Sequence, residues 1–274
     1  MIQAYGECSS VVELRIVDPA VAGSIPVTHP KLPTFLKALE DRQLADLRFS
    51  EVTRALRALS STYVERRESA LADRKALDGA GKRAAFALYY GPIHFLLIQH
   101  IVRELGASFR PGIVVDLGCG TGVAGAAIAT STTPPLRVFG VDTHPWTLDE
   151  ARFTYTTFGL QSDVRRSHAA KTRFPSDTSV VVAAFIVNEL NDQDRAALLE
   201  NLKHAESRKT HVLIVEPISQ RISPWWDQWA AEFARIGGRA DLWKARIDPP
   251  PTVKRLAKAA GLRPDMLTAR SLFV

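Results

Sequence analysis

Hydrophobic residues change their spacing near residue 110, which divides the chain into two regions. From 32 to 105 they recur every three or four positions, and this spacing predicts a series of amphipathic helices. Pro92 suits the first turn of a helix, and the apolar face of that helix continues at Ile93 and Leu97. The first region is therefore expected to be entirely helical.

After residue 110, short continuous apolar runs alternate with helical stretches. The runs predict buried strands at 113–117, 136–142, 180–187 and 211–217. Helices are predicted between them, at 121–129, 145–158 and 192–205. Apolar strands joined by helical crossovers indicate an α/β fold with a mostly parallel sheet covered on both faces. We expect 218–251 to be an irregular insertion rich in Trp and Pro, before a helix at 252–260 and a short edge strand ending at Val274.

The first thirty residues do not follow either pattern. Residues 6–30 show no periodicity and lack the basic start and apolar core of a signal peptide. The genetic code allows codons for residues 6–8 that are complementary to codons for 27–29. Codons for the residues between them can form two further base-paired arms. The stretch thus resembles an in-frame translation of a transfer-RNA gene, with an ordinary disordered leader as the alternative. We expect 1–30 to be a non-native leader, without a role for Cys8, Asp18 or His29.

Composition narrows the class of protein. The 274 residues are 46% hydrophobic and 23% charged, which excludes a disordered chain. No uninterrupted apolar run reaches the length of a membrane span, and two cysteines do not make a disulfide framework. The net charge is +6, and 217–274 holds ten basic and five acidic residues. We therefore expect a cytoplasmic protein without a membrane partner, whose charge permits an acidic one.

A glycine-rich turn joins the first predicted strand of the second region to its helix. The sequence of this turn is VVDLGCGTG (114–122), with glycines at 118, 120 and 122. Glycines let the backbone approach a ligand closely, and a helix N-terminus favours an anionic group. The last two glycines, with Gly125, also match a dinucleotide-binding pattern. Asp116 favours another ligand, because a carboxylate before the glycines accepts bonds from an ammonium group and repels a pyrophosphate.

This arrangement resembles the first motif of the class I S-adenosylmethionine-dependent methyltransferases. The resemblance implies a seven-stranded, doubly wound, Rossmann-like sheet at 110–274 with an N-terminal helical extension at 31–109. It also implies that S-adenosylmethionine is the cofactor. Asp142, which ends the second strand, would hold the ribose, and His168 would lie near the adenine. The implied cofactor-binding residues are Asp116, Gly118, Cys119, Gly120, Gly122, Asp142, Thr143 and His168. Helix capping before Pro145 is the alternative role for Thr143.

Asn188 and Glu189 directly follow the apolar strand that faces the transferable methyl group in such enzymes. Glu189 is the candidate for orienting or deprotonating the methyl acceptor, with Asn188 beside it. Capping of the helix near Asp192 is the alternative for Asn188. Once the leader is set aside, the remaining cysteine lies in the glycine turn, which argues against thiolate-dependent carbon methylation. No Cys/His cluster has the spacing of metal ligands, so we expect no metal.

Aromatic residues at two places in the sequence have either a packing or a functional role. Trp225 and Trp229 share a helix face, so at least one should pack against the core, with stacking on a base as the functional alternative. Tyr89 and Tyr90 can cover a cofactor, but core packing of the helices is the simpler reading.

The order of motifs over 32–217 is similar to the methyltransferase-like family associated with the mitochondrial small ribosomal subunit and its bacterial relatives. That resemblance places Glu216 in the cleft with Asn188 and Glu189. It implies methyl transfer to an O or N acceptor on ribosomal RNA or a ribosome-bound target, and no DNA partner. The chain departs from the family because 218–274 contains no cysteine for the iron–sulfur cluster proposed in many members. A small-molecule methyltransferase, a non-catalytic ribosome assembly factor and a dehydrogenase remain alternatives.

Overall fold

The computed structural model describes residues 15–17, 29–65 and 77–274. The strands are β1 Arg15–Val17, β2 Ile113–Leu117, β3 Arg137–Asp142, β4 Ser162–Arg166, β5 Thr178–Ala184, β6 His211–Glu216, β7 Arg239–Arg246 and β8 Met266–Phe273. The α-helices are α1 Leu32–Gln43, α2 Phe49–Glu65, α3 Ala80–Ala85, α4 Gly91–Glu104, α5 Val123–Ala129, α6 Pro145–Thr157, α7 Asp192–Ser207, α8 Trp226–Arg235 and α9 Pro251–Ala260. A π-helical turn, Phe86–Tyr90, joins α3 to α4, and 3-10 turns occur at Ala169–Lys171, Val187–Glu189 and Gln220–Ile222.

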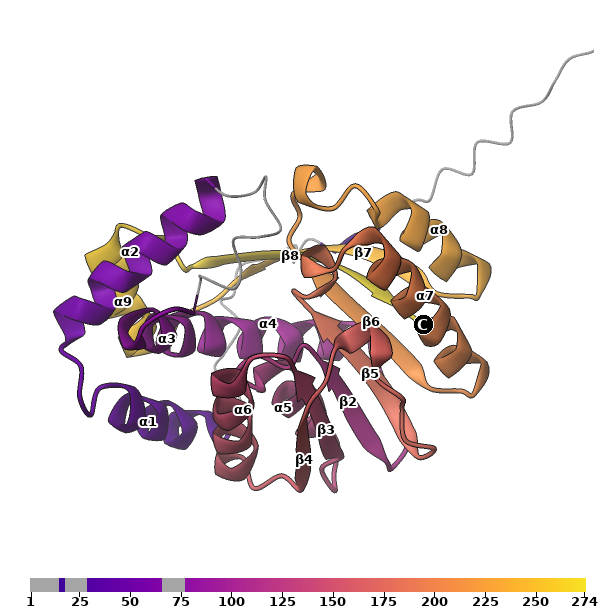
Figure 1. Cartoon of the computed structure of the whole chain (residues 1–274), viewed down its shortest axis with the longest axis horizontal. Coiled ribbons are helices and arrows are strands. Elements are labelled where there is room, and N and C mark those ends of the chain that lie inside the picture. Colours follow the sequence, from indigo (N-terminus) through magenta and orange to yellow (C-terminus); the bar gives the residue numbers. More distant parts are fainter. Residues whose placement is uncertain (1–14, 18–28, 66–76) are drawn as a thin grey trace, which may run out of the picture.

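The strands form one sheet in the order β1-β7-β8-β6-β5-β2-β3-β4 (Figure 1). Strands β2 to β6 run parallel, whereas β8 is antiparallel to both β6 and β7. From β2 the chain proceeds to β3 and β4 on one side, and then returns to β5 and β6 on the other. Such a reversal opens a crevice at the carboxyl ends of the strands, where α/β proteins bind ligands. The doubly wound Rossmann-like sheet is thus confirmed, with β1 added at one edge.

Two hydrophobic cores cover the two faces of the sheet. Every residue of β2 is buried, and its alternating side chains enter both cores. Helices α4, α5 and α6 pack on one face, and α7 and α8 on the other. The sequence of α5, VAGAAIA, is buried throughout, because small side chains let this helix lie close to the strands. This close packing fixes the start of α5 next to the end of β2.

Helices α1, α2, α3 and α4 confirm the helical prediction for the described part of 32–105, but the last part is one long helix and not two. The Gly91 N–H donates to the Phe86 carbonyl five residues earlier, which widens the helix into a π turn and carries it past Pro92. By length and composition, Ala80–Glu104 is a helix that can cross a membrane, yet 78% of its apolar window is buried inside the protein. It is therefore a core helix, and α4 packs against α5.

The described part of 1–30 makes contacts with the rest of the protein. Strand β1 pairs in parallel with the outer edge of β7, with Arg15 opposite Asp241. The His29 ring packs edge-on against Phe95 and Phe158, with centroids 5.7 and 5.3 Å away. The expectation that His29 has no role is thus wrong as regards packing. Cys8 and Asp18 lie outside the described residues, and the transfer-RNA origin of the stretch stays a prediction.

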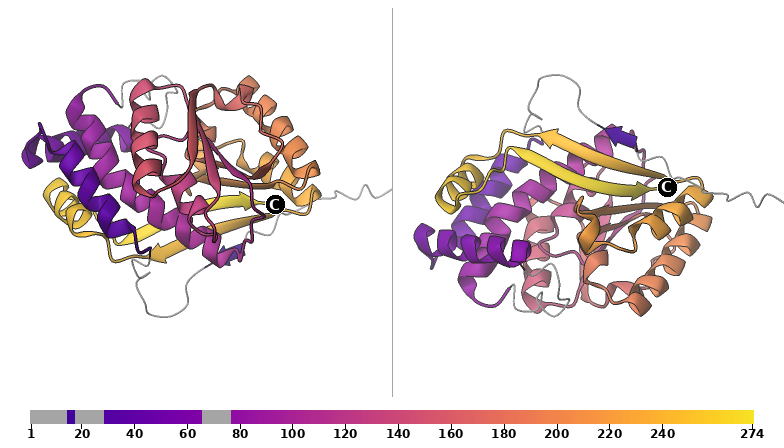
Figure 2. Two further views of the ribbon diagram at one scale, coloured as in Figure 1. Left: turned by 90° about the horizontal axis from the view of Figure 1, so that it is seen from below. Right: turned by 90° about the horizontal axis from the view of Figure 1, so that it is seen from above.

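The C-terminal part differs most from the sequence-based expectation. The stretch at 218–251 is not an irregular insertion, because it contains helix α8 and strand β7. Strand β8 is eight residues long and lies between β6 and β7 instead of at an edge. Figure 2 shows β7 and β8 as a long antiparallel pair. Turn-forming prolines at 249–251 concealed how regular the flanking segments are.

Replacing Phe233 in α8 should therefore destabilise the whole domain. Phe233 is 1% exposed in the core between α8 and the sheet, so Phe233→Ala should lower the free energy of unfolding by about 3–5 kcal/mol. Gln228→Ala on the exposed face of the same helix should change it by less than about 0.5 kcal/mol. Urea unfolding followed by circular dichroism measures both values. Equal effects of the two substitutions would contradict the packing of α8.

Candidate functional site

The glycine-rich turn follows β2, at the point where the strand order reverses, and has little room for side chains. Gly118, Gly120 and Gly122 have φ values of +60°, +51° and +78°, which residues with a Cβ rarely adopt. A Cβ on Gly118 would lie 2.5 Å from Cγ1 of Ile186, in the segment after β5. A Cβ on Gly122 would lie 2.9 Å from the Ala151 backbone on α6. The turn is thus held between the β5 end and α6.

Asp116 is a buried carboxylate at the end of β2. Its Oδ2 accepts hydrogen bonds from the Gly125 N–H and the Tyr155 hydroxyl, both at 2.8 Å. Burial raises the pKa of Asp116 to about 7, partly opposed by these two bonds. Both bonds end on Oδ2, and none of the hydrogen bonds among the described residues reaches Oδ1. The second oxygen therefore keeps its full acceptor capacity.

Asp142 ends β3 and is half-buried beside the same turn. Its Oδ2 accepts the Gly120 N–H at 3.0 Å, and its Oδ1 accepts the His144 N–H at 2.9 Å. Each oxygen keeps acceptor capacity for a further donor, such as a ribose hydroxyl. His144, and not Thr143, caps α6, because its Nδ1 accepts the Trp146 N–H. The capping alternative for Thr143 is therefore wrong, and its exposed side chain lies next to Asp142.

Cys119 and His168 occupy different environments around the turn. The Cys119 side chain is 5% exposed, and its Sγ lies 3.3 Å from where a Cβ on Gly140 would be. Burial raises the pKa of this thiol well above its usual value, so it stays protonated, and only its backbone can serve the turn. His168 follows β4, with Nε2 at 3.7 Å from Asp194. Its Nδ1 is buried and lacks a hydrogen-bond partner among the described residues, so it can bind a polar ligand atom.

A second buried carboxylate, Glu216, holds the turn that faces the glycine loop. One oxygen accepts the Val187 N–H at 2.8 Å and the Asn188 N–H at 3.4 Å, and the other accepts the Asn188 side-chain amide at 2.6 Å. Glu216 is fully buried, and burial raises its pKa to about 8, opposed by these bonds and by Arg270. Glu216 thus supports the turn that carries Asn188 from inside the protein, and its place in the substrate cleft stays a prediction.

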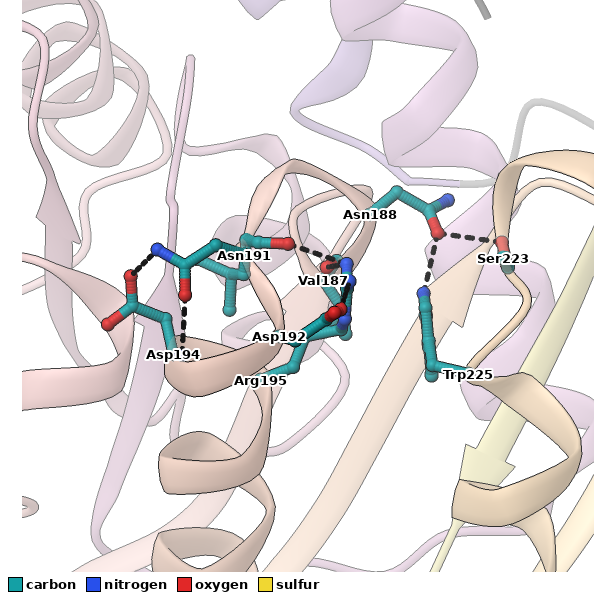
Figure 3. Close-up of polar contacts among 9 residues, drawn as sticks. Val187, Asn188, Asn191, Asp192, Asp194, Arg195, Ser223 and Trp225 are labelled. Carbon is teal, nitrogen blue, oxygen red and sulfur yellow. Dashed lines mark hydrogen bonds and ion pairs between the residues drawn. The ribbon is translucent and has the colours of Figure 1, made fainter. Parts of the chain in front are cut away.

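Asn188 links this turn to the segment before α8. Its Oδ1 accepts hydrogen bonds from the Ser223 hydroxyl at 2.7 Å and from the Trp225 indole N–H at 2.9 Å (Figure 3). Asn188 does not cap α7, because Asn191 performs that role through the Asp194 N–H. The side chain of Asn188 thus positions three segments, since it contacts β6 and the 223–225 segment as well as its own turn.

Glu189 lies at the end of the same 3-10 turn and is exposed. The structure thus places it beside Asn188 at the carboxyl edge of the sheet. Its part in proton transfer stays a prediction. Among the described residues, no group of three His, Cys, Asp or Glu side chains lies close enough to hold a metal ion.

Sequence reasoning missed the part that Tyr155, Ser223 and Trp225 play in building the site. Tyr155 connects Asp116 to Gly122 and Gly140, whose absent Cβ atoms would lie 3.0 to 3.1 Å from its ring or hydroxyl. The position of Tyr155 within α6 gives no indication in the sequence that it contacts Asp116. Ser223 and Trp225 were hidden within the stretch expected to be irregular. Trp225 and Trp229 are both buried, which confirms the packing alternative for these side chains.

Comparisons with known proteins agree with this geometry. Residues 114–206 match a protein family described as a methyltransferase domain. The chain is 28% identical over 126 residues to 2-ketoarginine methyltransferase of Streptomyces arginensis, which covers 44% of this chain. It spans 35% of the length of that curated relative. Residues 114–206 therefore have the sequence features of a methyltransferase domain.

Solved structures show a distant likeness. A methyltransferase of Aquifex aeolicus superposes with a TM-score of 0.43 at 16% identity, over 64% of this chain and 87% of that one. For precorrin-6y C5,15-methyltransferase of Geobacter metallireducens, the TM-score is 0.44 at 9% identity, over 65% and 87%. For the tRNA (uracil-54, C5)-methyltransferase of Pyrococcus abyssi in complex with S-adenosylhomocysteine, it is 0.41 at 14% identity, over 65% and 38%. These values carry no conclusion about the acceptor.

Replacing Gly118 with alanine should disrupt the turn by more than the strain of its positive φ value alone. Gly118 and Gly106 have nearly equal φ values of +60° and +62°, but a Cβ on Gly106 meets nothing within 4 Å. Gly106→Ala should therefore cost only about 1 kcal/mol of stability and leave cofactor affinity unchanged. Gly118→Ala should also displace Ile186 and weaken cofactor binding at least about tenfold. Calorimetry and thermal unfolding measure both effects, and equal cofactor affinities would refute the contact.

Burial of Asp116 should make the cofactor-free protein less stable as pH rises. Because its pKa is raised to about 7, the folded state keeps a proton between pH 4 and 7 that the unfolded state has released. Unfolding free energy should therefore fall over this range, by up to about 4 kcal/mol from this group. Asp116→Asn keeps an oxygen for both hydrogen bonds and should remove this part of the decline. Urea unfolding from pH 4 to 8 tests it, with exposed Asp149→Asn as the control.

Proposed function

We propose that the chain is an S-adenosylmethionine-dependent methyltransferase that acts on an oxygen or nitrogen acceptor. One observation carries this proposal: two carboxylates, Asp116 and Asp142, bracket a glycine turn at the point where the strand order reverses. A methionine moiety offers an ammonium group to one carboxylate, and a ribose offers two hydroxyls to the other. The cofactor, when bound, supplies a methyl group already activated by the sulfonium.

Different residues of the site would bind different parts of the cofactor. Asp116 would hold the ammonium group through its Oδ1, and the backbone from Gly118 to Gly122 would lie against the methionine moiety. Asp142 would accept the ribose hydroxyls, while its bonds to Gly120 and His144 keep its side chain in place. The unpartnered Nδ1 of His168 would face the adenine edge. These residues bind and orient, which is most of what alignment of a methyl donor requires.

The acceptor side is formed by the turn that Glu216 holds. Asn188 fixes the segment after β5 against the 223–225 segment, so this edge of the site is rigid before a substrate arrives. Glu189, at the exposed end of this turn, would orient the acceptor or accept its proton. Rigid positioning of this kind contributes to rate because the reacting atoms need no further alignment.

A small-molecule acceptor has the better support of two candidates. The curated relative is named for 2-ketoarginine, a small metabolite, and its similarity covers 44% of this chain. Ribosomal RNA or another ribosomal target is the second candidate, favoured by the ten basic and five acidic residues of 217–274. A cytoplasmic enzyme would meet both kinds of acceptor.

Transfer of a labelled methyl group into a cell extract tests the function. With tritiated S-adenosylmethionine, we expect label in the metabolite fraction, whereas salt-sensitive label in RNA would support the second candidate. Asp142→Ala should abolish both cofactor binding by calorimetry and label transfer, and Asp149→Ala, an exposed α6 residue, should change neither. Cofactor binding without label in any fraction would indicate a non-catalytic binding protein. Unchanged affinity in Asp142→Ala would refute the assignment of the site.

A further inference from the structure

Three aromatic rings gather where the π turn meets the end of β5. Tyr90 and His94 lie one turn apart on the long helix, with ring centroids 5.9 Å apart. His94 stacks on Phe185, with centroids 4.2 Å apart and an angle of 22° between the ring planes. We call Tyr90, His94 and Phe185 the aromatic wall. Tyr89 supports it from the core, since it is 6% exposed and contacts Tyr90 edge-on at 5.0 Å.

The aromatic wall borders the glycine turn from two sides. Gly91, next to Tyr90, lies so close to the turn that a Cβ would be 3.6 Å from the Thr121 hydroxyl. Phe185 directly precedes Ile186, whose side chain fills the space where Gly118 lacks a Cβ. The residues that follow Tyr90 and Phe185 in the chain therefore contact the turn that would receive the methionine moiety.

Phe185 has a backbone conformation that is unusual for its residue type. Its φ is +61°, and it ends β5 three residues before the sequence pattern predicts. The Phe185 N–H still donates to the Val215 carbonyl at 2.8 Å, and the next residues are held by Glu216, so the conformation is fixed from both sides. Such conformations cluster at ligand sites, and so do π turns within helices.

The rings of the aromatic wall are uncharged at neutral pH. Burial lowers the pKa of His94 to about 4, and burial together with Tyr89 raises the pKa of Tyr90 to about 12. Neutral aromatic faces attract cations through their quadrupole, as in the aromatic sites that recognise quaternary ammonium groups. A sulfonium is a cation of the same kind, with its charge spread over carbon substituents.

We propose that the aromatic wall recognises the sulfonium of S-adenosylmethionine and thereby favours the methyl donor over its product, S-adenosylhomocysteine. The two molecules differ by one methyl group and one positive charge, so only the donor gains from a cation–π contact. Loss of the charge on methyl transfer would then weaken this contact and assist product release. This inference rests on the proposed function and names a specificity that the two carboxylates cannot supply, because the ammonium and ribose are common to both ligands.

Calorimetry with the full chain and the two ligands tests the proposal. Phe185→Leu and His94→Leu remove an aromatic face but keep an apolar side chain. Each should weaken S-adenosylmethionine binding by roughly five- to thirtyfold and change S-adenosylhomocysteine binding less than about twofold. His94→Phe should retain donor affinity, because the contact needs a ring face and not an imidazole nitrogen. Phe49→Leu, a half-buried ring on α2 under Arg255, is the matched control and should change neither affinity.

The outcomes separate this proposal from the proposed function. Equal weakening of both ligands in the Leu variants would show that the rings shape the site without reading charge, and would overturn the inference alone. Unchanged affinities of the Leu variants for both ligands would also overturn the inference alone. Failure of the unaltered protein to bind either ligand would overturn the proposed function and this inference with it. Thermal unfolding of each variant checks that it folds. If Phe185→Leu does not fold, His94→Leu provides the test.

Discussion

The bond between Asp116 and Tyr155 is the interaction on which the cofactor side of the structure depends. A carboxylate buried at the end of a central strand loses hydration, and the loss is compensated by the Tyr155 hydroxyl and the Gly125 N–H. Tyr155 can reach Asp116 only because Gly122 and Gly140 leave room for its ring. The pattern of glycines therefore follows from this packing as much as from any ligand.

Glu216 plays the corresponding part on the acceptor side. It lies at the end of β6, two strands from Asp116, and holds backbone N–H groups that would otherwise lack partners at the end of β5. Its second oxygen holds Asn188, which reaches Ser223 and Trp225. Two buried carboxylates thus fix two facing turns. Burial of each carboxylate lowers the stability of the cofactor-free protein, and its hydrogen bonds keep the site organised.

Sequence reasoning succeeded where local pattern and physics agree. Buried strands such as 113–117 and the glycine turn have strong periodic and conformational signals, so the parallel sheet and the expected ligand edge followed from them. It missed β7 and predicted β8 only as a short edge strand, because prolines at 249–251 and a mixed polar pattern hid how regular these segments are. It also could not find Tyr155 or Phe185, since one acts through a contact distant in sequence and the other through a backbone angle.

The two margins of the sheet offer little to a strand of another molecule. One margin is β4, whose sequence SDVRR exposes charged side chains on both sides of a single buried Val164. The other is β1, which covers β7 over only three residues. Without residues 1–30, the outer rim of β7 would present free N–H and C=O groups. Exposed Lys244 and Arg246 on that strand would then repel a second strand and protect against edge-to-edge aggregation.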